Sequence, residues 1–351
     1  MQRPLHGLRE HDAPADAVRH GTEVAFAVES IAVDGTDRIR EDVLETIGRT
    51  PMVRLNRVIP HDAAEVVAKL EFFSPGGSIK DRAALAMIDA AERSGRILRD
   101  HGATIVEPSG GNTGVGLAMV CAVRGYRCVI VVPEMTSKDK LSVLRAFGAE
   151  VVIARADVEG GSPEGYIGKA EALAKELGAF MPDQFENPAN PNTHVLTTAL
   201  EILEQCENKV DAFVACVGSG GTLGGVSRVL RERVPGVRIV GAAPDPTSAA
   251  GPHGSIVEGV VDDLDSCAVH GVAPDEVELV SDRDAVSMML ALARQEGILA
   301  GTSSGVAVTA ALRVALRLGP GKRVVTIVPD TGRNYLSSCL DPSWREARGL
   351  V

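Results

Sequence analysis

The stretch TIVEPSGGNTGVGLAMVCAVRGYRCVIVV, residues 104–132, contains a complete strand–loop–helix–strand unit. Two apolar runs, 104–107 and 127–132, are expected to be strands, and 112–124 is expected to be a helix. Short strands that are almost continuously apolar are typical of parallel sheets covered by helices on both faces. In such sheets, ligands bind beyond the carboxyl ends of the strands, where glycine-rich turns lead into helices. The unit therefore predicts both a fold class and the place of a binding site.

The same alternation of β-branched runs and longer helical stretches covers most of the chain from Val43 onward. It predicts an α/β fold with parallel sheets and helices on both faces. The other expected strands are 66–70, 150–154, 212–217, 238–243 and 323–328. The other expected helices are 81–94, 137–147, 166–177, 197–206, 222–233, 282–295 and 304–318.

Composition and charge restrict the class of protein. The chain has 351 residues, 45% of them hydrophobic, so it is long enough for one large domain or two interlocked domains. Residues 1–40 are polar and lack periodicity, which predicts a loosely ordered arm and no signal peptide. No run approaches the roughly 18 apolar residues of a membrane span, so we expect no membrane association. The net charge of −11 argues against nucleic-acid binding.

None of the six cysteines forms a CxxC pair, and several lie in apolar runs, such as Cys128 in RCVIVV and Cys216 in FVACVG. This usage favours reduced thiols packed in the core of a cytoplasmic protein. We expect no metal site. Because only 3% of the residues are aromatic, aliphatic side chains are expected to form most of the core.

The segment SPGGSIKDR, residues 74–82, places Lys80 at the expected start of a helix, directly after two glycines. Glycines allow close approach of the backbone, and the positive end of a helix dipole disfavours the charge of a lysine. A lowered lysine pKa is what Schiff-base chemistry requires. A surface lysine that follows a loop is the alternative interpretation of this segment alone.

The segment EPSGGNTG, residues 107–114, again lies between a strand and a helix. Free backbone N–H groups at a helix start, together with Ser109, Asn112 and Thr113, would form an anion site the size of a carboxylate. The alternative is a simple helix cap with Ser109 or Asn112 as the N-cap residue. The glycines and hydroxyls exceed what a cap needs.

Two further glycine-rich turns follow expected strands or precede expected helices. Gly218-Ser219-Gly220-Gly221-Thr222 exposes successive backbone N–H groups, which suits a phosphate, although it matches neither a Walker loop nor a GxGxxG motif. Gly301-Thr302-Ser303-Ser304-Gly305 opens the last long helix. By itself it is reasonably explained by a serine N-cap, but together with the other three motifs it becomes a candidate cofactor contact.

The four motifs in the order GGSIKDR, SGGNTG, GSGGT and GTSSG resemble those of the fold-type II pyridoxal-phosphate (PLP) enzymes. The resemblance extends from about Asp42 to Trp344 and is greatest to the cystathionine β-synthase and cysteine synthase branch. It implies two interlocked parallel-sheet α/β domains of the tryptophan synthase β type. The implied domains are an arm 1–40, a large PLP-binding domain formed by 41–80 and 188–351, and a small domain 81–187. The stretches that carry the resemblance, besides the four motifs, are ETIGRTPMVRLNRV, AVRGYRCVIVVPEMTSKDK, LRAFGAE, DQFENPANPNTH, ARQEGILAGTSSG and VPDTGRNYLSSCLDPSW.

The resemblance also implies a role for each site residue. Lys80 would form the Schiff base with PLP and later move protons at the substrate Cα, and Asn112 would hydrogen-bond the ring oxygen of PLP. Gly218, Ser219, Gly220, Gly221 and Thr222 would bind the PLP phosphate. Ser303 would face the pyridine nitrogen. The substrate carboxylate would be bound by Ser109, Gly110, Thr113 and Gln184.

These roles imply β-replacement on serine or an activated serine. A neutral hydroxyl at Ser303 would keep the ring a weaker electron sink than a carboxylate would, so that loss of the β-substituent is favoured and an aminoacrylate is formed. Small amino acids are then the expected substrates, and family analogy implies a cytoplasmic homodimer. Homocysteine is the favoured nucleophile, followed by sulfide.

Departures from the family pattern concern the pocket. Gly110 stands where the family commonly has a serine, so one hydroxyl is lost. Glu258 matches the family segment VEGIGYD, whereas Val261 and Asp262 replace a glycine and an aromatic residue. Both replacements should alter the pocket, and therefore the nucleophile.

Three alternatives remain from the sequence. The first is replacement by an amine or another nucleophile to give a non-standard amino acid, which the departures favour. The second is serine/threonine deamination in the same fold. The third is a scaffold that has lost its chemistry, which the presence of Lys80, Asn112, the phosphate loop and Ser303 disfavours.

Overall fold

The computed structural model describes residues 38–251, 254–260 and 273–350. All the elements discussed below belong to one compact unit, Arg40–Val351. Most of the arm expected at 1–40 lies outside the described residues. The same holds for Val261, Asp262 and Cys267, so the expectations on these residues stay predictions.

A six-stranded sheet has the order β1-β2-β9-β6-β7-β8. All neighbouring strands are parallel except β1, which pairs antiparallel with β2 at the edge. Its strands are β1 (Met52–Arg54), β2 (Glu65–Leu70), β6 (Ala212–Cys216), β7 (Arg238–Pro244), β8 (Glu276–Val280) and β9 (Arg323–Val328).

A second sheet is formed by three parallel strands in the order β3-β4-β5. These strands are β3 (Thr104–Pro108), β4 (Arg127–Pro133) and β5 (Glu150–Ala154). Ten α-helices are found among the described residues: α1 (Lys80–Arg93), α2 (Asn112–Arg124), α3 (Lys138–Ala146), α4 (Tyr166–Leu177), α5 (Ala189–Thr193), α6 (Ala199–Gln205), α7 (Gly221–Arg233), α8 (Asp282–Ala291), α9 (Thr302–Leu318) and α10 (Pro342–Glu346).

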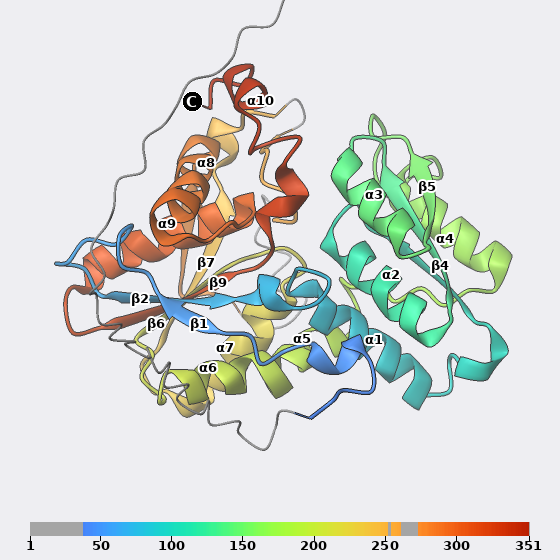
Figure 1. Ribbon diagram of the computed structural model, residues 1–351, viewed down its shortest axis with the longest axis horizontal. Coiled ribbons are helices and arrows are strands. Elements are labelled where there is room, and N and C mark those ends of the chain that lie inside the picture. Colours follow the sequence, from blue (N-terminus) through green and yellow to red (C-terminus); the bar gives the residue numbers. More distant parts are fainter. Residues whose placement is uncertain (1–37, 252–253, 261–272, 351) are drawn as a thin grey trace, which may run out of the picture. The chain divides into compact units, whose positions relative to one another are not determined.

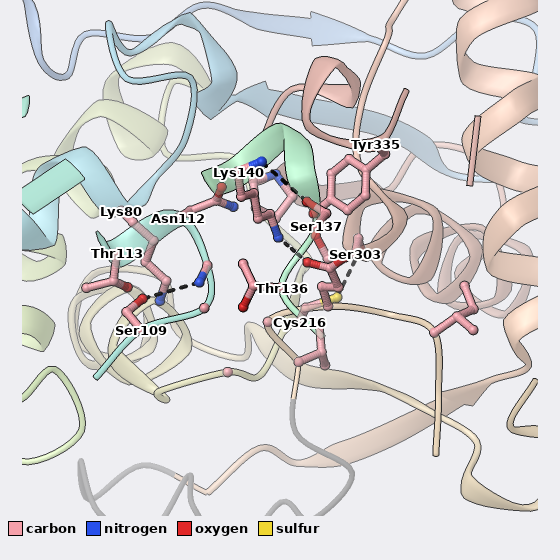
Figure 2. A pocket seen from close by; sticks show the side chains of 18 of the residues that line it. Lys80, Ser109, Asn112, Thr113, Thr136, Ser137, Lys140, Cys216, Ser303 and Tyr335 are labelled. Atoms are coloured by element: carbon pink, nitrogen blue, oxygen red, sulfur yellow. Dashed lines mark hydrogen bonds and ion pairs between the residues drawn. The ribbon is translucent and has the colours of Figure 1, made fainter. Parts of the chain in front are cut away.

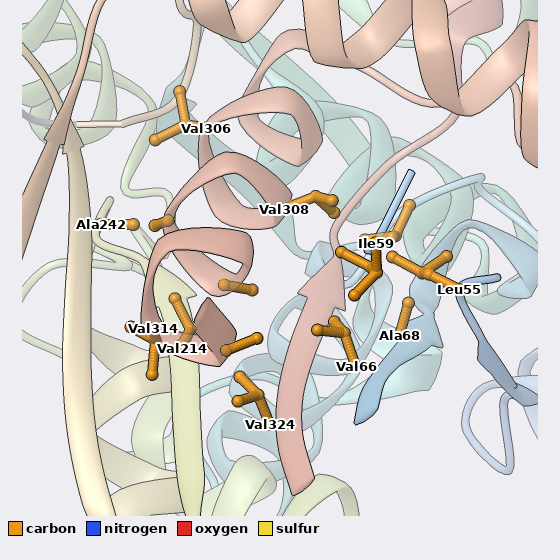
Figure 3. Packing of buried hydrophobic residues seen from close by; sticks show 14 of the residues in the cluster. Leu55, Ile59, Val66, Ala68, Val214, Ala242, Val306, Val308, Val314 and Val324 are labelled. Carbon is orange, nitrogen blue, oxygen red and sulfur yellow. The ribbon is translucent and has the colours of Figure 1, made fainter. Parts of the chain in front are cut away.

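Helices cover both faces of the larger sheet, as the continuous apolar strands predict (Figure 1). On one face, Val66, Val214 and Val324 pack against small residues of α9, including Val306 and Val308 (Figure 3). On the other face, residues one position along the same strands pack against α6 and α7; they include Val67, Phe213, Ala215 and Val325. Because successive strand residues point to opposite faces, both faces must be apolar when both are covered.

The three-stranded sheet is built in the same way. Ile105, Ile130 and Val132 contribute to a cluster with α1, α2 and α3, whereas Val106 and Val129 face α4. The α/β fold class expected from the sequence is confirmed.

Some elements were not expected. The short edge strand β1 pairs only with β2. In the edge strand β8, half-buried and exposed residues alternate before the buried Val280, so neither strand has a buried apolar run. The expected helix 197–206 is α6 preceded by a π-helical segment, His194–Thr198, and the expected helix 282–295 is α8 followed by another, Leu292–Glu296. The short helices α5 and α10 lack the periodic length that reveals a helix in a sequence.

No helix among the described residues is long and apolar enough to cross a membrane. The five described cysteines are free thiols, and four of them are buried: Cys121, Cys128, Cys206 and Cys339.

Candidate active site

A cavity of about 950 Å³ lies where the carboxyl ends of strands from both sheets meet. Eleven of the twelve site residues expected from the sequence line this cavity (Figure 2). The exception is Gly221, the first residue of α7, which is buried. Segments that are far apart in the sequence therefore come together at one site.

Lys80 is the first residue of α1, and its Nζ lies 3.4 Å from Ser219 Oγ across the cavity floor. Burial lowers the pKa of Lys80 to about 8. A lowered pKa for Lys80 was expected from the helix dipole at the start of α1. The pKa is lowered, but the cause in the structure is burial. The loop before Lys80 is attached to the end of β9, because Ile79 N donates to Pro329 O at 2.8 Å.

The glycines of SPGGSIKDR have separate structural reasons. Gly77 has a φ of +84°, a conformation that favours glycine. Gly76 N donates to Asp81 Oδ2 at 2.7 Å, and a Cβ at position 76 would overlap with that carboxylate. Burial raises the pKa of Asp81 to about 7, although the hydrogen bond from Gly76 acts in the opposite direction.

The loop Gly218–Thr222 leads from β6 into α7, with Gly220 at the N-cap in a left-handed conformation. A Cβ at Gly218 would overlap with the carbonyl oxygen of Gly259, and one at Gly221 would overlap with the side chain of Asn190. Only small residues fit, and the backbone N–H groups of the helix start remain available for an anion.

Asn190, which the sequence analysis did not single out, links two of the loops. Its Nδ2 donates to Ser219 Oγ at 2.9 Å and to Gln184 O at 2.8 Å. Asn190 is fully buried. In the sequence it is one of three asparagines in DQFENPANPNTH, and no pattern distinguishes it from the other two.

The loop after β3 is held by its own side chains. Ser109 Oγ accepts hydrogen bonds from Gly111 N at 3.3 Å and Gly114 N at 3.0 Å. Thr113 Oγ1 donates to Gln184 Oε1 at 2.6 Å. The N-cap residue of α2 is Gly111, so neither Ser109 nor Asn112 is the cap that the alternative interpretation requires.

Glu107, at the end of β3, connects this loop to the segment that contains Gln184, and it was not expected as a site residue. Its carboxylate accepts from Asp183 N at 2.8 Å and from Gln184 N at 3.2 Å. Asp183 has a φ of +54°, a strained conformation for a residue other than glycine. Burial raises the pKa of Glu107 to about 7, while the two backbone hydrogen bonds lower it.

Asn112 is oriented by two partners on the opposite wall. Its Nδ2 donates to Asp330 Oδ2 at 2.8 Å, and its Oδ1 accepts from Asn334 Nδ2 at 3.2 Å. Tyr335 Oη donates to the same Asp330 oxygen at 2.8 Å. Burial raises the pKa of Asp330, against the hydrogen bond from Asn112.

Ser303 lies on the same wall, in the first turn of α9, and is 7% exposed. The N-cap residue of this helix is Gly301, where a Cβ would overlap with the carboxylate of Asp330. The interpretation of this turn as a serine N-cap is therefore wrong. Nearby, the Cys216 thiol donates to Ser303 O at 3.1 Å.

An ion pair between Lys140 and Glu258 completes this wall. The Lys140 side chain is 3% exposed, and its Nζ lies 5.2 Å from the ring centroid of Tyr335. Among the described residues, no cluster of side chains could hold a metal ion.

Comparison with known proteins identifies the family. The family described as "Pyridoxal-phosphate dependent enzyme" matches residues 43–330. The chain belongs to this family. It is 45% identical over 306 residues to a cysteine synthase of Staphylococcus aureus, covering 86% of this chain and 96% of that protein. It is 42% identical over 325 residues to a cystathionine β-synthase of Rattus norvegicus, covering 90% of this chain and 58% of that longer protein.

Solved structures agree with this assignment. The structure of O-ureido-L-serine synthase superposes with a TM-score of 0.77 at 38% identity, covering 86% of this chain and 95% of that chain. The O-acetylserine-dependent cystathionine β-synthase of Helicobacter pylori also has a TM-score of 0.77, at 35% identity, covering 86% and 98%. The protein is therefore a PLP-dependent enzyme of the β-replacement type, as the sequence predicts.

The residues of the cavity fit pyridoxal phosphate. A buried lysine with a lowered pKa is suited to react with an aldehyde, and the loop Gly218–Thr222 excludes side chains where a phosphate would meet backbone N–H groups. Asn112 and Ser303 line the same cavity and would offer neutral polar groups to the ring of the cofactor.

Proposed function

We propose that this PLP-dependent enzyme replaces the β-substituent of L-serine or an activated L-serine, with Lys80 as its catalytic residue. The observation that carries the proposal is the position of Lys80. Its Nζ lies 3.4 Å from Ser219 Oγ in the loop Gly218–Thr222, which we assign to the cofactor phosphate. The loop Ser109–Thr113, which we assign to the substrate carboxylate, lines the same cavity. A cofactor and an amino acid bound to these two loops would both lie within reach of Lys80.

When bound, pyridoxal phosphate withdraws electrons from the substrate Cα, which makes loss of the Cα proton and of the β-substituent possible. The chain's own residues hold and orient the reactants. Ser109, Gly110, Thr113 and Gln184 bind the substrate carboxylate, and Gly218–Thr222 bind the cofactor phosphate. Asn112, which hydrogen-bonds Asp330, would bind the ring oxygen of the cofactor, and Ser303 would bind its ring nitrogen.

Lys80 moves the proton at Cα. A pKa of about 8 leaves a usable fraction of neutral amine near neutral pH, so Nζ can accept a proton and later return it. Burial is the cause of this pKa, so exclusion of water from the cavity floor is part of the same function.

Homocysteine is the favoured nucleophile, followed by sulfide, as for a cystathionine β-synthase or cysteine synthase. Lys140 and Glu258 carry opposite charges on the wall beside Tyr335. A zwitterionic nucleophile such as homocysteine complements this pair, whereas sulfide makes no use of it.

Another nucleophile that gives a non-standard amino acid is the second candidate. It is favoured by the glycine at position 110 and by the similarity to O-ureido-L-serine synthase. Deamination of serine or threonine is a weaker alternative, because the relatives named here are synthases.

We also propose a homodimer in the cytoplasm, by analogy with the family. The division into a large domain, 41–80 with 188–351, and a small domain, 81–187, is part of this proposal. It agrees with the sheets, since β3, β4 and β5 all lie within 81–187. Light scattering at micromolar concentration that shows only monomer would contradict the dimer.

The test is a substrate panel on the holoenzyme. L-Serine, O-acetyl-L-serine and O-phospho-L-serine are each combined with homocysteine, sulfide, hydroxyurea and a primary amine, and the amino-acid products are separated by mass spectrometry. We expect one β-substituted alanine to dominate. Release of 2-oxo acid at the same rate with and without every nucleophile would instead indicate deamination.

A further inference from the structure

Thr136 has a buried hydroxyl with no hydrogen-bond partner, although the residue lines the cavity. A hydroxyl in such a place costs free energy unless a ligand or water satisfies it. In Figure 2, Thr136 is drawn between Ser109 on one side and Cys216 and Ser303 on the other. Thr136 therefore lines the cavity beside the loop Ser109–Thr113 and carries a hydroxyl without a partner.

The backbone holds Thr136 firmly at this place. Thr136 N donates to Pro133 O at 2.9 Å, which closes a turn directly after β4. Glu134 N donates to Ala154 O at 2.9 Å, and Ser137 caps α3 by accepting from Lys140 N. Because contacts anchor both sides of Thr136, its hydroxyl has a defined location even without a partner.

The hydroxyl also occupies space that Gly110 leaves free. A Cβ built at Gly110 would lie 2.9 Å from Thr136 Oγ1 and 2.9 Å from Pro133 Cδ. Any side chain at position 110 of the loop Ser109–Thr113 would therefore compete with Thr136 for the same volume.

The loop Ser109–Thr113 has few side-chain hydrogen-bond donors left for a ligand. The proton of Thr113 is directed to Gln184 Oε1, and Gly110 has no side chain. Ser109 Oγ accepts from two backbone N–H groups, so only its own proton is available to a ligand. A carboxylate bound there would gain from one more hydroxyl.

We propose that Thr136 determines specificity in the amino-acid site: its hydroxyl donates a hydrogen bond to the α-carboxylate of the substrate, in place of the side chain that Gly110 lacks. This inference rests on the proposed function. Thr136 comes from the loop after β4, so the carboxylate would be held from two separate loops rather than from the loop after β3 alone.

The test is calorimetric binding to the holoenzyme of Thr136→Val, which removes the hydroxyl and keeps the shape. L-Alanine carries the carboxylate without a leaving group, L-alaninamide lacks the carboxylate, and L-serine adds the β-hydroxyl. We expect Thr136→Val to weaken L-alanine and L-serine equally, by roughly 10-fold or more, as for a hydrogen bond to a charged group. L-Alaninamide should bind as it does to the parent, and Thr136→Ser should restore L-alanine binding.

Thr309→Val is the matched control, because Thr309 also has a buried, unpartnered hydroxyl but does not line the cavity. It should leave all three affinities unchanged. If Thr136→Val is poorly folded, Thr136→Ala, which adds no atoms, gives the same comparison of ligands.

Three results would overturn the inference: unchanged L-alanine binding in Thr136→Val, an equal loss for L-alaninamide, or a loss confined to L-serine. The last would place the hydroxyl at the β-substituent. Failure of the proposed function looks different, since the parent holoenzyme would then bind none of the three ligands.

Discussion

Lys80 and Arg82 lie two residues apart at the start of α1, but their surroundings differ in charge. Arg82 forms two-pronged hydrogen bonds with Glu71 and with Glu201, at 2.7–3.0 Å. Lys69 Nζ lies 2.9 Å from Glu201 Oε2. In this buried cluster two cations face two carboxylates, so the charges compensate one another.

The pKa values follow from that arrangement. Burial alone lowers the pKa of Arg82, but hydrogen bonds and the charges of Glu201 and Glu71 raise it overall. Burial alone raises the pKa of Glu201, and Arg82 and Lys69 bring it down to about 2. Both groups therefore stay charged at every physiological pH.

The groups in and beside the cavity show the opposite behaviour. Burial lowers the pKa of Lys80 and raises those of Glu107 and Asp330, so each shift favours the neutral form. The hydrogen-bond partner of Lys80 is the neutral Ser219, and those of Glu107 are backbone N–H groups. The structural cluster is therefore compensated in charge, whereas Lys80 in the cavity and Glu107 and Asp330 beside it hydrogen-bond only to neutral groups.

The largest effect is expected at Lys80. Lys80→Ala should lower turnover by several orders of magnitude while the far-UV circular dichroism stays unchanged, because a buried lysine with a lowered pKa has a chemical and not a structural role. Borohydride reduction of the parent should leave the cofactor on the peptide that contains Lys80. Attachment to another lysine, such as Lys140, would contradict this. Lys175→Ala, at an exposed position on α4, is the control and should retain activity.

Arg82→Met tests the compensated cluster. It should destabilise the protein by about 3–5 kcal/mol, because the buried Glu71 loses its cation and Glu201 keeps only Lys69. Denaturant unfolding measures the change. Arg155→Met is the matched control: Arg155 pairs with Asp157 and Glu164 at the surface, where all three side chains are more than half exposed. Its cost should be much smaller than that of Arg82→Met, because solvent screens an exposed ion pair. Equal costs would show that the cluster is no different from a surface pair.

Glu107→Gln tests an uncompensated group through pH. The pKa of Glu107 rises from its ordinary value of 4.5 to about 7 in the folded protein, so the folded state binds more protons between these values. Stability should then fall as pH rises from about 4.5 to about 7, by up to about 3 kcal/mol from this group.

The Gln variant should lose that part of the pH dependence, which is measured by unfolding both proteins across the window. Asp81 shifts in the same direction, so only the difference between the two proteins is assigned to Glu107. Identical pH profiles would show that Glu107 does not titrate there.

Ser303→Ala should have the smallest effect. The Ser303 side chain is neutral, so the free energy of unfolding of the cofactor-free protein should change by less than about 0.5 kcal/mol. Cofactor binding should weaken by about 1 kcal/mol, the net value of one neutral hydrogen bond. The measurement is unfolding with and without bound cofactor. An equal loss in both forms would give Ser303 a structural role instead.

The sequence by itself was sufficient for the units whose pattern is local. Continuous apolar strands, followed by glycine turns and helices, predicted the α/β class, and the bounds of α2 and α4 agree with prediction. Glycine-rich turns were also expected from the local sequence, and Gly77 and Gly220 have positive φ values that other residues avoid. The motif order was enough to single out Lys80 and two glycine-rich loops, which the structure brings to one cavity.

The tertiary structure alone decided the contacts between distant segments. Glu107 meets Gln184 across 77 positions, and Asn112 meets Asp330 across 218. Thr136 in the loop after β4 fills the space beside Gly110, and Glu201 on α6 provides a partner to Arg82. No periodicity or spacing reveals such pairs, because burial and hydrogen bonding depend on which surfaces the fold brings together. The same burial, and not the local helix start, sets the pKa of Lys80.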